Sequence, residues 1–136
     1  MPNRIVRSKS NQEGFTLLEI MVVLVIIGVL AALVAPRFLE RADEAKVEAT
    51  KVQMKNIGQA LKLYRLQHGK YPDSAAGLQV LSSGNKRYID SIPKDPWGND
   101  YVYLSPGVHG DFDILSYGVD GQSGGSGMDA DIGNWQ

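Results

Sequence analysis

A single carboxylate stands inside a long apolar segment near the start of this sequence. The segment runs from Phe15 to Ala35, and Glu19 is its only charged residue. A charged side chain costs about 2.5–3.5 kcal/mol at the centre of a membrane helix and less near its end. Cleavage between Gly14 and Phe15 would create a partner for Glu19, because the new α-amine would lie one helical turn away, in the same chain or a neighbouring copy. The alternative is an accidental charge at the membrane interface.

A second group of carboxylates lies in a glycine-rich C-terminal tail. The final 19 residues contain six glycines, and no Lys or Arg follows Lys94. Ordering such a chain costs on the order of 1–2 kcal/mol per residue, and gathered carboxylates repel one another. A calcium ion would solve both problems, because it takes roughly six to eight oxygen ligands, backbone carbonyls included. Asp120, Asp129 and Asp131 are the best side-chain candidates, although their spacing does not fit an EF-hand. A solvated acidic tail is the alternative.

The apolar segment is long enough to cross a membrane. Its 21 residues would form a helix of roughly 31 Å, close to the hydrocarbon thickness of a bilayer. A secretory signal peptide is the other interpretation, with a cleavage site near Ala35, although its apolar region is usually only about 7–15 residues long. Arg4, Arg7 and Lys9 precede the segment, which favours a cytoplasmic N-terminus and a body on the far side of the membrane.

The helix is expected to continue beyond the membrane, with a kink or loosened hydrogen bonding at Pro36. Apolar and small residues recur at helical spacing after Arg37 and predict one buried face. The residues of this face are Val47, Thr50, Met54, Ile57, Leu61 and Tyr64. Gly69 and Pro72 are expected to end the helix after about 50 residues.

The remaining sequence predicts a small body with antiparallel strands. Ser74 is expected to cap a short helix that reaches Leu81, and the proline-rich stretch "RYIDSIPKDPWGND" is expected to be an ordered loop. The stretches "YVYLS" and "DFDILSYG" indicate two strands joined by the turn "PGVHG". The fold class is therefore α+β, with a long N-terminal helix, first half transmembrane and second half amphipathic, packed on a small C-terminal antiparallel sheet with ordered loops.

Other candidates for chemistry are few. The net charge of −1 gives no indication of a nucleic-acid partner, and the chain has no cysteine. His68 and His109 are the only histidines, and neither has a cysteine or a nearby carboxylate at metal-ligand spacing. Trp97 and Trp135 are expected to pack loops against the body, with an aromatic carbohydrate platform as the alternative. No catalytic residues are predicted.

The stretch "GFTLLE", residues 14–19, resembles the class III signal of type IV pilins and type II secretion pseudopilins. The resemblance implies that a prepilin peptidase cleaves after Gly14 and N-methylates Phe15. It also implies that Glu19 acts in subunit assembly.

The body resembles the major pseudopilins of type II secretion systems, through "KYP", "IPKDPWGNDY" and "DADIGNW". This resemblance implies a calcium site formed by the three tail aspartates with the backbone carbonyls of Tyr117 and Ser126. Type IV pilins more often close this region with a disulfide, which a chain without cysteine cannot form.

The same resemblance implies a domain organisation and a function. Residues 1–14 would be a cytoplasmic leader peptide that is removed, residues 15–35 a transmembrane and assembly helix, and residues 36–136 a periplasmic globular domain. The chain would span the bacterial inner membrane once and polymerise with its own copies into a periplasmic helical filament that drives protein export across the outer membrane. Its partners would be a prepilin peptidase, minor pseudopilins and the inner-membrane assembly platform. The alternatives are a type IV pilin for adhesion or motility and a membrane-tethered calcium-binding domain; none of these roles is enzymatic.

Overall fold

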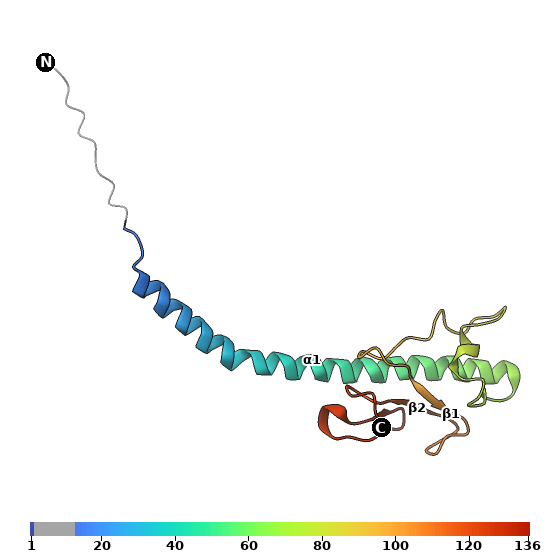
Figure 1. Cartoon of the computed structure of the whole chain (residues 1–136). Helices are drawn as coiled ribbons and strands as arrows, with labels where there is room; N and C mark the ends of the chain where they lie inside the picture. The colour runs from blue at the N-terminus through green and yellow to red at the C-terminus, as the bar shows by residue number, and fades with distance from the viewer. Residues whose placement is uncertain (2–12) are drawn as a thin grey trace. The chain divides into compact units, whose positions relative to one another are not determined.

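A computed structural model describes Met1 and residues 13–136 of the chain. Most of the expected leader, with its three basic residues, lies outside the described residues. The chain divides into two compact units, Met1–Leu39 and Glu40–Gln136. The helix α1, Leu17–His68, begins in the first unit and ends in the second, and its two parts are described separately (Figure 1).

The part of α1 in the first unit carries the expected membrane segment. By length and composition α1 is the one described helix that could cross a membrane, and none of its apolar window is buried in the protein. Pro36 lies inside the helix, which does not end there. Because the apolar side chains find no protein core within this unit, they form an exposed apolar surface of the kind that marks a membrane or protein interaction site.

The part of α1 in the second unit buries one face, as the apolar spacing predicts. Its fully buried residues are Thr50, Met54, Ile57, Ala60 and Leu61, and Val47 and Tyr64 are partly buried against the core. The helix ends where Gly69 takes a left-handed conformation with φ of +77°. The N–H of Gly69 donates to the carbonyl of Arg65 at 2.7 Å, which satisfies one of the last carbonyls of the helix.

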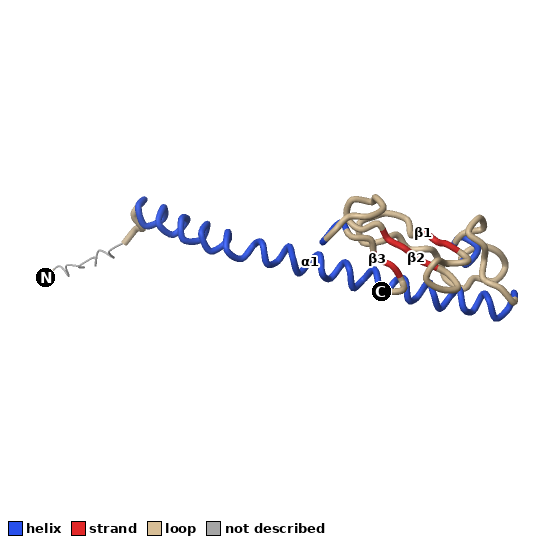
Figure 2. Tube along the Cα trace, turned by 90° about the horizontal axis from the view of Figure 1, so that it is seen from below, coloured by secondary structure: helices blue, strands red, loops and turns tan. Residues whose placement is uncertain are grey.

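A small three-stranded antiparallel sheet lies among the loops of the second unit. Strand β1, Val102–Leu104, pairs with β2, Asp113–Ser116, and β2 pairs with β3, Ile132–Gly133. Figure 2 shows the three strands side by side near the second part of α1. The sequence predicts β1 and β2 but not β3, because two residues in a glycine-rich tail are too few to show an alternating pattern.

The core joins the helix to the sheet and to the segment between them. Its members are Met54, Ile57, Ala60, Leu61, Leu78, Leu81, Tyr101, Tyr103, Ile114 and Ile132. The expected short helix is present only as a 3₁₀ turn, Leu78–Leu81, and Ser74 does not cap it. The Ser74 hydroxyl instead bonds the backbone N–H and carbonyl of Ser105, at 2.8 and 3.2 Å. Gly77 breaks the helical path before Leu78, since its φ is +65°.

Candidate functional site

The first candidate site is the start of α1. The Thr16 hydroxyl accepts a hydrogen bond from the backbone N–H of Glu19, with 3.2 Å between Oγ1 and N. Thr16 is therefore the N-cap, and Glu19 is the third residue of the helix. A carboxylate in the first turn interacts favourably with the helix dipole, by about 0.3–1 kcal/mol. Thr16 is absent from the predicted site residues, although T-x-x-E before an apolar run is an N-terminal helix signal.

Phe15 and Glu19 share one face of this helix start. With Leu18 and Val22 they line a shallow open groove, and Phe15 is 85% exposed. The Glu19 carboxylate makes no hydrogen bond or ion pair with any residue that the structure describes. A charge on an otherwise apolar surface gains most from a cation supplied from outside this helix, because the low dielectric strengthens the attraction.

Gly14 precedes the helix in an open position. A Cβ atom built on Gly14 would meet no atom within 4 Å, and Gly14 is not among the glycines with positive φ. Neither packing nor backbone conformation in the described residues therefore requires glycine here. A requirement for glycine at this position must come from a molecule that binds the segment.

The second candidate site is the acidic loop, residues 117–131, between β2 and β3. Asp131 is half-buried, and its Oδ2 accepts the N–H of Gly124 at 2.9 Å. Its other oxygen, Oδ1, is buried and has no hydrogen-bond partner among the described residues. A buried carboxylate oxygen without a donor is costly, so Asp131 carries an unused acceptor inside the loop.

The two other predicted aspartates lie in the same loop but are exposed. Asp120 Oδ1 accepts the N–H of Gln122 at 3.1 Å, which closes a local turn. Asp129 ends the 3₁₀ turn Gly127–Asp129. Within the described part of the chain, no three His, Cys, Asp or Glu side chains are grouped closely enough to hold a metal ion. The fold thus brings the three aspartates into one loop but does not gather their carboxylates.

Backbone carbonyls crowd the inside of the acidic loop. Gly118 has a φ of +67°, and a Cβ atom there would lie 3.0 Å from the carbonyl oxygen of Ala130 and 3.2 Å from that of Met128. Tyr117 is half-buried directly after β2, and the Ser126 carbonyl accepts the N–H of Asp129 at 3.2 Å. The carboxylates and backbone carbonyls of the loop therefore offer oxygen ligands, which is the chemistry that Ca²⁺ prefers.

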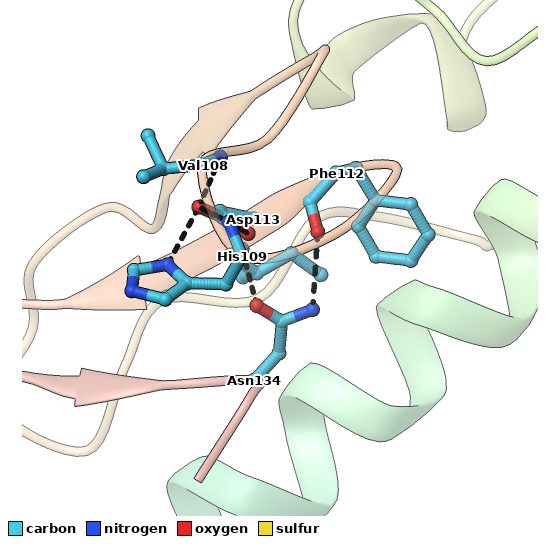
Figure 3. A network of polar contacts seen from close by, with 6 residues as sticks. Val108, His109, Phe112, Asp113 and Asn134 are labelled. Carbon is cyan, nitrogen blue, oxygen red and sulfur yellow. Dashed lines mark hydrogen bonds and ion pairs between the residues drawn. The ribbon is translucent and has the colours of Figure 1, made fainter.

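A third polar cluster ties the C-terminus to the β1–β2 turn (Figure 3). His109 Nδ1 lies 3.0 Å from Asp113 Oδ2, and the N–H of Val108 donates to the same oxygen at 2.8 Å. Asn134 Oδ1 accepts the N–H of Ile114 at 2.8 Å. The expectation that His109 lacks a nearby carboxylate is wrong, because the loop 105–112 between β1 and β2 brings His109 onto Asp113.

The cluster has a structural role. Burial alone raises the pKa of the Asp113 carboxyl, but hydrogen bonds from the His109 ring and from the Val108 and His109 amides outweigh it, so its pKa lies below the ordinary value. The ring of Trp135 stacks on that of His109 with 3.8 Å between centroids. Trp135 therefore packs against the body, as the sequence predicts, and its ring faces a histidine.

A capped apolar helix with one exposed glutamate, followed by a small helix-and-sheet body, defines a pilin-like subunit. Residues 9–35 match the family model of the prokaryotic N-terminal methylation motif. Residues 37–135 match the family model of protein G of the type II secretion system. The chain belongs to this protein G family.

Similar proteins support the same assignment over nearly the full length. The type II secretion system core protein G of Pseudomonas aeruginosa is 49% identical, over 93% of this chain and 97% of that protein. Its counterpart in Vibrio cholerae is 48% identical, over 91% of this chain and 92% of that protein. A crystal structure of the major pseudopilin from the type 2 secretion system of enterohaemorrhagic Escherichia coli has a TM-score of 0.63 at 34% identity, covering 71% of this chain and 92% of that one.

Proposed function

We propose that this chain is the major subunit of a type II secretion pseudopilus. After removal of the leader, its copies assemble through their N-terminal helices into a periplasmic filament that drives protein export across the outer membrane. The membership in the protein G family carries this proposal, and the exposed apolar surface of the first part of α1 supports it. The role is structural rather than catalytic, and the family favours secretion over adhesion or motility.

Processing by a prepilin peptidase is the first step of the proposed function. The peptidase cuts between Gly14 and Phe15 and methylates the new amine, which leaves residues 15–35 as the single membrane span, with a cytoplasmic N-terminus and a periplasmic body. The openness of Gly14 supports this step, because its own fold gives no reason for a glycine. A narrow binding site on the peptidase would explain why glycine is needed at position 14.

Filament formation then relies on Glu19. In the membrane the Glu19 carboxylate of one copy pairs with the methylated Phe15 amine of its neighbour, where the low dielectric makes an unpaired charge costly. The Thr16 cap supports this role, because it fixes the first turn that presents Glu19. Minor pseudopilins and the inner-membrane assembly platform are the remaining partners that the family implies.

Calcium binding by the acidic loop completes the proposal. Asp120, Asp129 and Asp131 would hold the ion together with the backbone carbonyls of Tyr117 and Ser126. The buried, unpartnered Oδ1 of Asp131 supports this set. A bound calcium ion would supply positive charge that offsets the repulsion between these carboxylates. Because Asp120 and Asp129 are exposed in the structure, their carboxylates would hold the ion only after a rearrangement of the loop.

Analysis of the mature N-terminus tests the proposed processing. Mass spectrometry of the chain from bacterial membranes should find a methylated Phe15 as the first residue, and Gly14→Val should leave the full precursor. Gly28→Val is the matched control, because a Cβ at Gly28 also meets no atom within 4 Å, and it should be processed normally. A mature terminus near Pro36 in the wild type would instead indicate an ordinary signal peptide.

A further inference from the structure

A buried carboxylate outside the predicted ligand set organises a tight turn before β1. Asp95 is 4% exposed, and its Oδ1 accepts the backbone N–H groups of Trp97 and Asn99 at 3.1 and 2.8 Å. The turn is closed by the N–H of Asp95, which donates to the Asn99 carbonyl at 2.9 Å. Residues 95–99, called here the anchor turn, are thereby held as a rigid unit.

The anchor turn reaches the start of the acidic loop through a buried hydroxyl. Ser116, the last residue of β2, has no exposed surface, and its Oγ–H donates to Asp95 Oδ2 at 2.7 Å. The same Oγ accepts the N–H of Gly118 at 3.3 Å. Because a carboxylate can only accept, Asp95 makes the Ser116 hydroxyl donate to it, which leaves the oxygen lone pair for Gly118.

The side chain of Asn99, the last residue of the anchor turn, binds the backbone carbonyl of Gly118. The side-chain Nδ2 of Asn99 donates to the Gly118 carbonyl at 3.4 Å. Asn99 also lies beneath the next part of the loop, since a Cβ atom on Gly121 would be 3.5 Å from its side-chain nitrogen and oxygen. Both backbone groups of Gly118 are therefore bound to the anchor turn or to the hydroxyl that the turn orients.

This arrangement determines the direction of one proposed ligand. The N–H of Gly118 and the C=O of Tyr117 belong to the same planar peptide unit, in which they point in opposite directions. A hydrogen bond that fixes the Gly118 N–H toward Ser116 therefore fixes the Tyr117 carbonyl away from it. Gly118 itself faces the carbonyls of Met128 and Ala130 at the far end of the loop.

We propose that Asp95, Ser116 and Asn99 are positioning residues for calcium in the acidic loop, because their hydrogen bonds hold the Tyr117–Gly118 peptide, whose carbonyl is a proposed ligand, in a single orientation. This inference rests on the proposed calcium site. None of the three is a proposed ligand; each would position backbone that holds the ion. Loss of such outer partners typically weakens metal affinity by roughly 10–100-fold.

Calcium titration of the full chain in detergent micelles tests the inference. Ser116→Ala should raise the calcium Kd by roughly 10–100-fold. Ser116→Thr, which keeps the hydroxyl, should restore most of the affinity. Ser74→Ala is the matched control: it also removes a hydroxyl with two backbone hydrogen bonds, but away from the acidic loop, and its Kd should equal that of the wild type.

Thermal unfolding in excess chelator shows whether Ser116 positions a calcium ligand or only stabilises the fold. If Ser116→Ala lowers the calcium-free melting temperature but leaves the calcium Kd unchanged, Ser116 is structural and the inference is overturned. If Ser116→Ala does not fold, Asn99→Ala provides the same measurement, because the backbone bonds of the anchor turn do not involve the Asn99 side chain. An unchanged Kd in Asn99→Ala would then overturn the inference.

The wild type distinguishes the two proposals. If the wild type binds calcium and the Ser116→Ala and Asn99→Ala variants bind it equally well, only the positioning role fails. If the wild type shows no heat of binding and no calcium-dependent melting shift, the calcium site itself fails, and the positioning role with it.

Discussion

Replacement of Asp131 by asparagine tests the acidic loop at its buried oxygen. The amide side chain would keep the shape of the carboxylate and an oxygen able to accept the Gly124 N–H, which Asp131 now accepts at 2.9 Å. The replacement would remove the negative charge beside the unpartnered Oδ1 position. Asp131→Asn should therefore affect the calcium-bound protein far more than the calcium-free protein.

The size of the effect follows from ligand linkage. A ligand that binds only the folded state stabilises it by RT ln(1 + [L]/Kd), about 2.7 kcal/mol when free ligand is 100 times the Kd. Residues 40–136 form a compact unit with its own core, and for a unit of about 100 residues this corresponds to a rise of roughly 10–20 °C in melting temperature. Asp131→Asn should lose most of that rise.

The assay is thermal unfolding of the fragment 37–136, followed by circular dichroism in calcium, in excess chelator and in magnesium. Magnesium should stabilise the wild type poorly, because it requires a smaller octahedral site and releases water reluctantly. Asp100→Asn is the control with the same charge change. Asp100 is exposed and pairs with Lys94 at 3.2 Å outside the loop, and an exposed pair contributes little, so the calcium shift should remain.

Two results would refute the reasoning at different points. Equal melting temperatures of the wild type in calcium and in chelator would mean that the acidic loop is merely solvated. An undiminished calcium-dependent rise in the melting temperature of Asp131→Asn would mean that the ion binds elsewhere. The burial of Asp131 Oδ1 would then be unrelated to calcium.

Three further predictions concern assembly, the loop and acid stability. Glu19→Ala should still insert in the membrane but form few filaments, because the Phe15 amine of the neighbour loses its partner; a normal filament yield by electron microscopy would exclude an assembly role. Gly118→Ala should destabilise fragment 37–136 by about 1–3 kcal/mol, measured by urea unfolding, since the new Cβ would have a positive φ and lie 3.0 Å from the Ala130 carbonyl; no loss would show that the loop moves freely. Because the pKa of Asp113 is lowered in the folded state, its contribution to stability is present above the ordinary value of 3.8 and is lost as the pH falls below that value through the folded-state pKa; Asp113→Asn should flatten this part of the stability curve, and an unchanged acid dependence would contradict the assignment.

The long helix α1 was predictable because its signals are local, whereas the short helix expected after Ser74 is only a 3₁₀ turn. The apolar run from Phe15 to Ala35 indicates a helix by its length and composition. The spacing of three and four residues through Met54 and Ile57 indicates one buried helix face. The end at Gly69 follows from the backbone freedom of glycine. The two longer strands were predictable from turn residues and apolar content, whereas β3 has only two residues and depends on pairing with β2.

The polar contacts within the body were not predictable, because they join residues that the sequence separates. Asp95 and Ser116 lie 21 positions apart, and no periodic pattern connects a carboxylate in a loop with a hydroxyl in a strand. His109 and Asp113 are only four residues apart, but their contact depends on the backbone path of the loop 105–112 between β1 and β2. The residue types in that loop do not by themselves specify this path.

The sequence by itself determined the chemistry of the N-terminus, the membrane-length helix and the acidic character of the loop, because charge, apolarity and glycine content are properties of the residues themselves. Only the tertiary structure decided which groups are buried and which meet. Folding leaves one oxygen of Asp131 buried without a hydrogen-bond donor, and the turn at Asp95 is linked to Gly118 through the Ser116 hydroxyl. Burial and hydrogen-bond direction are set by the whole fold, because each depends on where distant segments come to lie.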